Sequence, residues 1–381
     1  MVFKKGLILL FCSLSIFTFG QTNSHKQINS VFNQLVISYG SSKPDPIFKI
    51  RDGKSSKPAE YSTKSTPTIF IDSYVYEICR SYGKDSLNSL SIILSHELVH
   101  YYEDHTFCSD YAVATRYKNK TLAPKLIKSS LVSSIEKETE ADQKGLFYAS
   151  AAGYSPFGLY SNLINRLYKD YKFPNELPGY PSKQERILYA KNAEDKAKEL
   201  FGYFLAGLKA MEEKKYPESI TAFNKANSFI PYRENFNNLG VAKTRQALDL
   251  KEPNTIERES PERFLYPLEI ENKSRLRKEI TRGGLDDTNE EIEKLLNEAQ
   301  KDFEEAIRLD PNFTKGYINL ACVSDLLENS NGAISILTKQ LLPKDKRESV
   351  DAQRILAIAY FHSNVKEYQE KADAIWKQLG K

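Results

Sequence analysis

Two histidines four residues apart, His96 and His100, constrain this chain more than any other feature of its sequence. They lie in an HELVH run late in an apolar stretch, and we expect one helix from Ser86 to about His105. Residues four apart project from one helical face, so the two imidazoles can bind one zinc ion, with each nitrogen about 2.0–2.1 Å from the metal. Glu97 would lie near the metal without binding it, which suits a base that activates water.

The acidic residues that could complete such a site lie on a second helix, expected from about Ile127 to Ala152. A spacing of four places Glu138 and Asp142 on one face, and Glu136 and Glu140 on a roughly opposite face. One interpretation is a solvated acidic helix. The other is that Glu138 is a third zinc ligand, and that Asp142 holds a ligating histidine by its other ring nitrogen.

The two motifs together resemble a known family. The HELVH run followed by Glu138-Thr139-Glu140-Ala141-Asp142 resembles the HExxH…ExxAD pair of the CAAX prenyl protease and HtpX family of zinc metallopeptidases. Residues 145–146 and 152–156 (GL and AGYSP) resemble that family's GL…AGYDP segment, and residues 180–186 (YPSKQER) resemble its HPSxxER segment. The resemblance covers roughly residues 67–190 and includes exported members of the β-barrel-assembly-enhancing protease type.

This resemblance implies a zincin-type metalloprotease domain, built of helices and a small β-sheet, with one zinc ion per chain. It implies that His96, His100 and Glu138 bind the metal and that Glu97 is the general base. It also implies that Asp142 orients a ligand. Glu140 stays open as the alternative third ligand.

Two further residues are singled out by the same comparison. His105 falls where exported members carry a histidine, but its five-residue offset rotates it off the face of His100, so we expect a supporting role rather than metal binding. Tyr180 stands where those members have histidine before the proline. Its hydroxyl could donate a hydrogen bond to the oxyanion during catalysis, and the alternative is a packed surface tyrosine.

The region before the HELVH run predicts a small sheet. A helix is expected over residues 24–39, strands over Ile47–Arg51 and Thr68–Asp72, and a short helix over Tyr74–Tyr82. An edge strand in this region could bind an extended peptide by adding it to the sheet.

The first twenty residues read as an export signal. Lys4 and Lys5 precede an apolar core of residues 6–19, which is too short for a comfortable membrane span, and no later stretch could span a bilayer. We therefore expect an exported, periplasmic or secreted protein, with membrane association left open.

The net charge of +4 is too small to indicate nucleic-acid binding. Cys79 and Cys108 flank the HELVH helix as a candidate disulfide, and buried thiols are the alternative.

From about residue 194 the sequence shows an internal repeat. Gly207, Tyr216, Phe223, Ala226 and Pro231 match the tetratricopeptide pattern, which restarts three more times before the C-terminus. Such repeats stack helix pairs into an α-solenoid with a concave surface, and a generic helical bundle is the alternative. A charged insertion at about 251–289 is expected to be a long loop or a partly disordered arm.

The sequence therefore predicts a mainly α protein with three segments: a signal peptide (1–20), a zinc metalloprotease domain (21–193) and a tetratricopeptide-repeat domain (194–381). The function expected by resemblance is an exported zinc-dependent endopeptidase, acting on polypeptides in envelope protein quality control, with repeats that recruit a protein partner or an unfolded client. The alternative is a latent or inactive protease fold that serves as a tetratricopeptide scaffold or chaperone.

Overall fold

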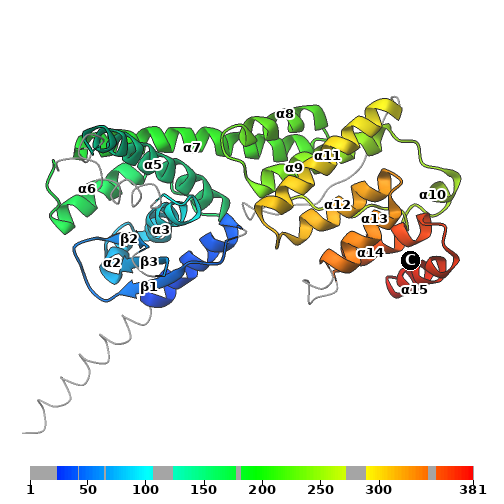
Figure 1. The fold of residues 1–381 in the computed structure, drawn as a ribbon, viewed down its shortest axis with the longest axis horizontal. Coiled ribbons are helices and arrows are strands. Elements are labelled where there is room, and N and C mark those ends of the chain that lie inside the picture. Colours follow the sequence, from blue (N-terminus) through cyan, green and yellow to red (C-terminus); the bar gives the residue numbers. More distant parts are fainter. Residues whose placement is uncertain are drawn as a thin grey trace, which may run out of the picture. The chain divides into compact units, whose positions relative to one another are not determined.

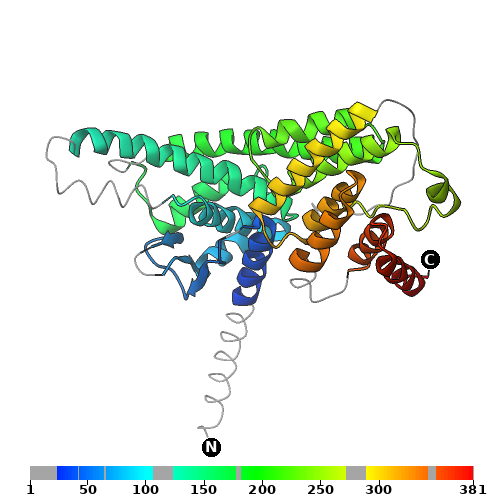
Figure 2. The ribbon, with the colours of Figure 1, turned by 45° about the vertical axis from the view of Figure 1, so that its right-hand side comes forward.

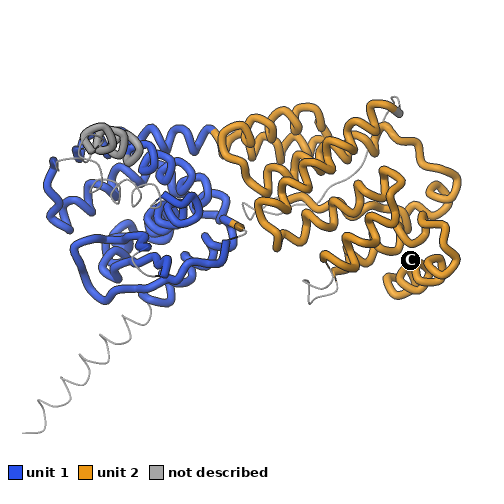
Figure 3. The backbone as a smooth tube through the Cα atoms, in the orientation of Figure 1, with its two compact units in different colours: residues 1–39, 43–199 blue, residues 40–42, 200–381 orange. Residues whose placement is uncertain are grey.

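The computed structural model describes residues 24–41, 43–63, 66–105, 123–176, 182–271, 289–341 and 349–380, with no side-chain description for 123–134 and 289. The described chain is mainly helical, with one small three-stranded sheet. It divides into two compact units, residues 1–39 with 43–199 (unit 1) and residues 40–42 with 200–381 (unit 2) (Figure 3). Among the described helices, none is both long and apolar enough to cross a membrane.

The sheet of unit 1 contains β1 (Ile47–Arg51), β2 (Ala59–Ser62) and β3 (Thr68–Asp72) in the order β1-β3-β2. β1 pairs with β3 in parallel, and β2 pairs with β3 antiparallel. The central strand is the most apolar, since Ile69 and Ile71 are fully buried. Both predicted strands are confirmed at their expected bounds, while β2 was not predicted because its sequence, AEYS, has little strand character.

Two helices and a short turn follow the sheet: α2 (Ser73–Arg80), η1 (Gly83–Asp85) and α3 (Ser86–Tyr102). α3 carries the HELVH run but ends three residues before the predicted end. Asp104 adopts a left-handed conformation with φ 54°, and the His105 backbone N–H returns to the carbonyl of His100 at 3.1 Å. This hydrogen bond and left-handed residue form the Schellman ending of a helix, so the chain reverses at this point.

After α3, the described part of unit 1 contains α5 (Ala123–Ala151), α6 (Tyr160–Tyr171) and α7 (Lys183–Glu212), which continues past the boundary between the units. α5 packs against α3 through small residues. Ala141 is fully buried, and a Cβ added at Gly145 would lie 3.1 Å from the backbone nitrogen of His96. Close approach of these two helices places their polar side chains within reach of one another.

Unit 2 consists of packed helices (Figures 1 and 2). In chain order they are α8 (Tyr216–Asn227), α9 (Arg233–Leu250), α10 (Thr255–Glu259), α11 (Asn289–Leu309), α12 (Thr314–Leu326), α13 (Ser330–Ser335), the π-helical η2 (Ile336–Leu341), α14 (Val350–His362) and α15 (Lys366–Gln378). α9 packs against α8 and α11, and α12 packs against α11, α13 and α14. Glycines allow two close contacts: a Cβ at Gly207 would lie 2.6 Å from the Phe223 ring, and one at Gly240 would lie 2.7 Å from the Phe303 ring.

Of the two expectations for the charged insertion, a long loop and a partly disordered arm, the long loop fits the part that the structure describes. Residues 251–271 contain α10 and an irregular segment that packs into unit 2. Phe264 is only 9% exposed and belongs to an apolar cluster with Trp376, and Tyr266 and Leu268 pack against the same cluster. These apolar residues, embedded among charges, anchor the segment.

Candidate metal site

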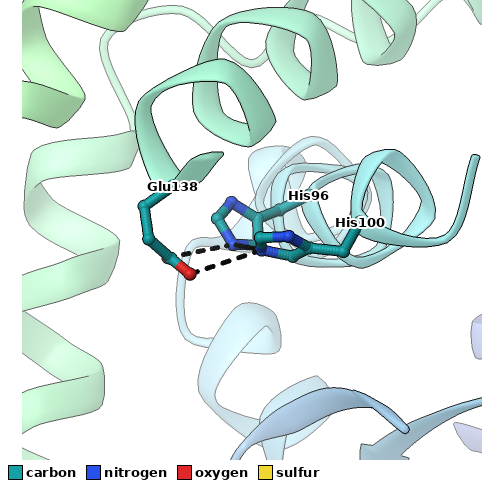
Figure 4. A group of neighbouring side chains, drawn as sticks. All are labelled: His96, His100 and Glu138. Carbon is teal, nitrogen blue, oxygen red and sulfur yellow. Dashed lines mark hydrogen bonds and ion pairs between the residues drawn. The ribbon is translucent and has the colours of Figure 1, made fainter. Parts of the chain in front are cut away.

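Three side chains from two helices of unit 1 converge on one point. His96 and His100 project from α3, and the Glu138 carboxylate on α5 points toward their ring nitrogens (Figure 4). The Glu138 oxygens lie 3.4 Å from His96 Nε2 and 3.5 Å from His100 Nε2, and the two nitrogens are 2.9 Å apart. Two ligand atoms of a tetrahedral zinc site, each about 2.0–2.1 Å from the metal, are about 3.3 Å apart. The three atoms are therefore spaced so that they could hold one metal ion.

The other ring nitrogen of His96 is held by Asp142, the last residue of the run 138–142. His96 Nδ1 lies 2.8 Å from Oδ1 of Asp142, whose side chain is fully buried. An ionised carboxylate only accepts hydrogen bonds, so the proton of a neutral His96 belongs on Nδ1. This arrangement leaves the lone pair of Nε2 directed at His100 and Glu138.

His100 is held in the same way, but by His105. The two Nδ1 atoms are 2.8 Å apart, and His105 Nε2 lies 3.3 Å from Oε2 of Glu140. If His100 Nδ1 donates to His105 Nδ1, the remaining proton of His105 faces the Glu140 carboxylate, and His100 Nε2 keeps its lone pair. The supporting role expected of His105 agrees with this contact, whereas the expectation that it is rotated away from His100 is wrong, because the helix ends at Tyr102 and the chain folds back.

The chemistry of this donor set calls for a cation. Two ring nitrogens and a carboxylate face one another, with the side chains of His96 and His100 each 13% exposed and that of Glu138 34% exposed. Burial opposes a charged imidazole, yet the hydrogen bonds to Asp142 and Glu138 raise the pKa of His96 to about 10. Burial and the charge of His96 lower the pKa of His100 to about 3. The pocket therefore stabilises one positive charge, and a metal ion can supply it without protonating either ring.

The structure separates the two candidates for the third ligand. Glu138 belongs to the cluster with the two histidines. Glu140, by contrast, faces His105 and forms an ion pair with Lys144 at 2.6 Å. Glu138 is therefore the carboxylate that could join the histidines at a metal ion.

Arg186 and Tyr160, to which the sequence assigned no role, hold the acidic residues in place. The Tyr160 hydroxyl donates to Asp142 Oδ1. Arg186 Nη1 lies 3.1 Å from Glu138 Oε2 and 3.8 Å from Asp142 Oδ2. Burial lowers the pKa of Arg186, but the surrounding carboxylates outweigh it and raise the pKa above its usual range. Arg186 therefore stays charged and orients both carboxylates.

The signal that could have identified Arg186 is a helix cap. Ser182 and Glu185 form a capping box at the start of α7: the Glu185 carboxylate accepts from the Ser182 backbone N–H at 2.7 Å, and the Ser182 hydroxyl accepts from the Glu185 N–H at 3.3 Å. This cap fixes where α7 begins, and thereby the direction in which the next residue, Arg186, projects.

Glu97 is placed beside the cluster, next to β2. It accepts a hydrogen bond from the Tyr61 backbone N–H and is partly exposed. Burial raises the pKa of Glu97 to about 7 against the opposing charge of His96, and the Glu138 carboxylate adds to the rise. Glu97 thus lies beside the three converging side chains without being one of them.

Two predicted features, Tyr180 and Cys108, lie outside the described residues. Cys79 is a buried free cysteine, as is Cys322 in unit 2.

No protein-family model matches the chain, and no curated protein is significantly similar to it. The functional proposal is therefore carried by the residues of the site themselves.

Proposed function

We propose that this chain is a zinc-dependent endopeptidase whose catalytic residues lie in unit 1 and whose unit 2 is a tetratricopeptide solenoid. The observation that carries the proposal is the donor set of His96, His100 and Glu138, which brings two imidazole nitrogens and one carboxylate oxygen together at one point. Three such protein ligands with one position left open are typical of catalytic zinc. Magnesium and calcium prefer oxygen ligands, so two imidazoles favour zinc over both.

Glu97 is the residue that moves protons in this proposal. Zinc, when bound by His96, His100 and Glu138, polarises a peptide carbonyl and makes water more acidic. The Glu97 carboxylate accepts the proton of the attacking water and returns it to the leaving amine. Asp142 and His105 keep the two imidazoles in the tautomer whose Nε2 is free to bind.

The position of β2 supports a polypeptide substrate. β2 lies at the edge of the sheet, with β3 as its strand partner among the described residues, and it also packs against α3. Its Tyr61 N–H reaches Glu97, so the strand edge runs beside the proposed catalytic base. An extended peptide added to this edge would bring its carbonyl groups to Glu97.

The close contacts in unit 2 support the assignment of tetratricopeptide repeats. Gly207 against Phe223 and Gly240 against Phe303 repeat one arrangement, a glycine on one helix that admits an aromatic ring from another. Stacked repeats of this kind bind extended protein segments, so we propose that unit 2 recruits a partner or an unfolded client. Export, and a role in envelope protein quality control, rest on residues 1–20 and on the family resemblance.

The proposal is tested by replacing the base and measuring metal and activity together. Glu97→Gln should keep zinc but lower the rate of peptide cleavage by about two to four orders of magnitude. Glu77→Gln, the same change on the exposed surface of α2, is the matched control and should alter neither quantity. Undiminished cleavage by Glu97→Gln in a folded, zinc-loaded chain would contradict the proposal.

A further inference from the structure

A segment of the insertion lies across α9 and α12, held there by asparagine side chains. Asn319 accepts from the Glu269 backbone N–H and donates to the Glu269 carbonyl, both at 2.8 Å. Asn238 does the same for Glu271, again with both distances at 2.8 Å. Asn237 adds a bond to the Glu269 carbonyl at 2.9 Å. The N–H and C=O groups of two alternate residues are thus paired as a neighbouring β-strand would pair them.

These asparagines are costly to the fold unless a peptide backbone covers them. Asn237, Asn238 and Asn319 are fully buried, and Asn319 also donates to Asn237 at 2.8 Å. A buried amide without a partner costs about 1–3 kcal/mol, and asparagine is a poor residue for a helix interior. The hydrogen bonds from these amides to the segment go only to its backbone, so they would bind an extended peptide without regard to its sequence. We name these three residues the asparagine face.

Side chains beside the asparagine face add a preference for acidic and apolar residues. Lys315 Nζ lies 3.2 Å from the Glu271 carboxylate and 3.8 Å from that of Glu269, and it donates to the Ile270 carbonyl at 3.3 Å. Ile270 and Leu268 pack against an apolar cluster of unit 2. A ligand that fits has acidic residues two positions apart with an apolar residue between them.

We propose that the asparagine face and Lys315 form a binding site for an extended polypeptide with acidic residues at alternate positions, and that residues 266–271 occupy this site in cis as a competitor. A tethered occupant acts at an effective concentration of about millimolar, so it weakens the apparent affinity for any partner. Partner binding then requires that the segment leave. The inference deepens the proposed recruiting role of unit 2, yet it rests on unit 2 alone and is independent of peptidase activity.

The first test removes the cis occupant and adds it back in trans. Residues 266–271 are replaced by six glycine and serine residues in the full chain, and a fluorescein-labelled peptide, FLYPLEIE (residues 264–271), is titrated by polarisation. The peptide should bind the open variant with a Kd at least tenfold lower than the wild type. Adding Asn319→Ala to the open variant should abolish binding, while Asn297→Ala, an exposed asparagine of α11, should not.

Equal binding by the wild type and a folded open variant would overturn cis competition, and no binding to a folded open variant would overturn the site. If the open variant does not fold, the intact chain provides the test through hydrogen exchange. Excess unlabelled peptide should speed exchange at the Glu269 and Glu271 amides by at least tenfold while α11 is unchanged. Unchanged protection of both amides under saturating peptide would show that the segment is a fixed part of the fold, and would overturn the proposal.

Discussion

Replacing His105 with phenylalanine should weaken zinc binding although His105 is not one of the converging ligands. The imidazole is buried, and its Nδ1 lies 2.8 Å from Nδ1 of His100. Phenylalanine keeps a ring in this space but removes the acceptor. The Nδ1–H of His100 then has no partner, although the His100 side chain is only 13% exposed. The imidazole ring of His100 is then free to turn.

The magnitude follows from that single lost hydrogen bond. Leaving a buried donor without a partner costs about 1–3 kcal/mol, and removing the partner of a metal-ligating histidine lowers metal affinity by about 10- to 100-fold. Since each factor of ten is about 1.4 kcal/mol, the two expectations agree. We therefore expect the zinc Kd of His105→Phe to rise by about 10- to 100-fold.

The assay is a competition titration of zinc against a chromophoric chelator at fixed pH, with the cobalt(II) absorption spectrum as a second readout of ligand geometry. His362→Phe is the matched control, because His362 belongs to unit 2, where it is hydrogen-bonded to the buried Asp325. The control should bind zinc as the wild type does. A folded His105→Phe chain with a zinc Kd within twofold of the wild type would refute the argument that His105 orients His100.

Three other predictions follow from particular residues. Glu138→Ala should strip zinc whereas Glu140→Ala should retain it, and metal analysis giving the opposite order would reverse the ligand assignment. Tyr180→Phe should lower kcat by roughly ten- to a thousandfold with KM little changed if the hydroxyl is an oxyanion donor, and an unchanged kcat would leave Tyr180 as a packing residue. Burial, aided by the Asp351 carboxylate, raises the pKa of Glu269 to about 7 against the charge of Lys315. The Glu269 carboxyl group therefore holds its proton more tightly in the folded chain than in the unfolded chain, and the free energy of unfolding should fall as pH rises from about 4.5 to 7. Urea unfolding of Glu269→Gln should show less of that fall, and an identical pH dependence would contradict the assignment.

Features set by local periodicity were predictable from sequence. The four-residue spacing put His96 and His100 on one helical face, and the same spacing put Glu138 and Asp142 on another. The strands Ile47–Arg51 and Thr68–Asp72 were equally visible, because they are short apolar runs between chain breakers. In each case the local pattern of apolar and polar side chains is enough to predict whether the segment is a helix or a strand, without contacts to distant residues.

Some missed features depend on an unusual local conformation, and others on contacts between segments far apart in the chain. His105 reaches His100, five residues before it, because Asp104 adopts a left-handed conformation, which aspartate adopts only occasionally. Arg186 reaches Glu138 and Asp142 from another helix. The segment at 266–271 resembles a charged loop, since its partners are asparagines on two distant helices and not neighbours in sequence. Such pairings are set by tertiary packing, which a single sequence does not reveal.

The most direct test of the central claim is X-ray absorption at the zinc edge of the purified chain after zinc loading and removal of excess metal. His96, His100 and Glu138 predict one zinc per chain, surrounded only by nitrogen and oxygen at about 2.0–2.2 Å. A spectrum with a sulfur ligand at about 2.3 Å, or a chain that retains well under one equivalent of zinc, would contradict the account.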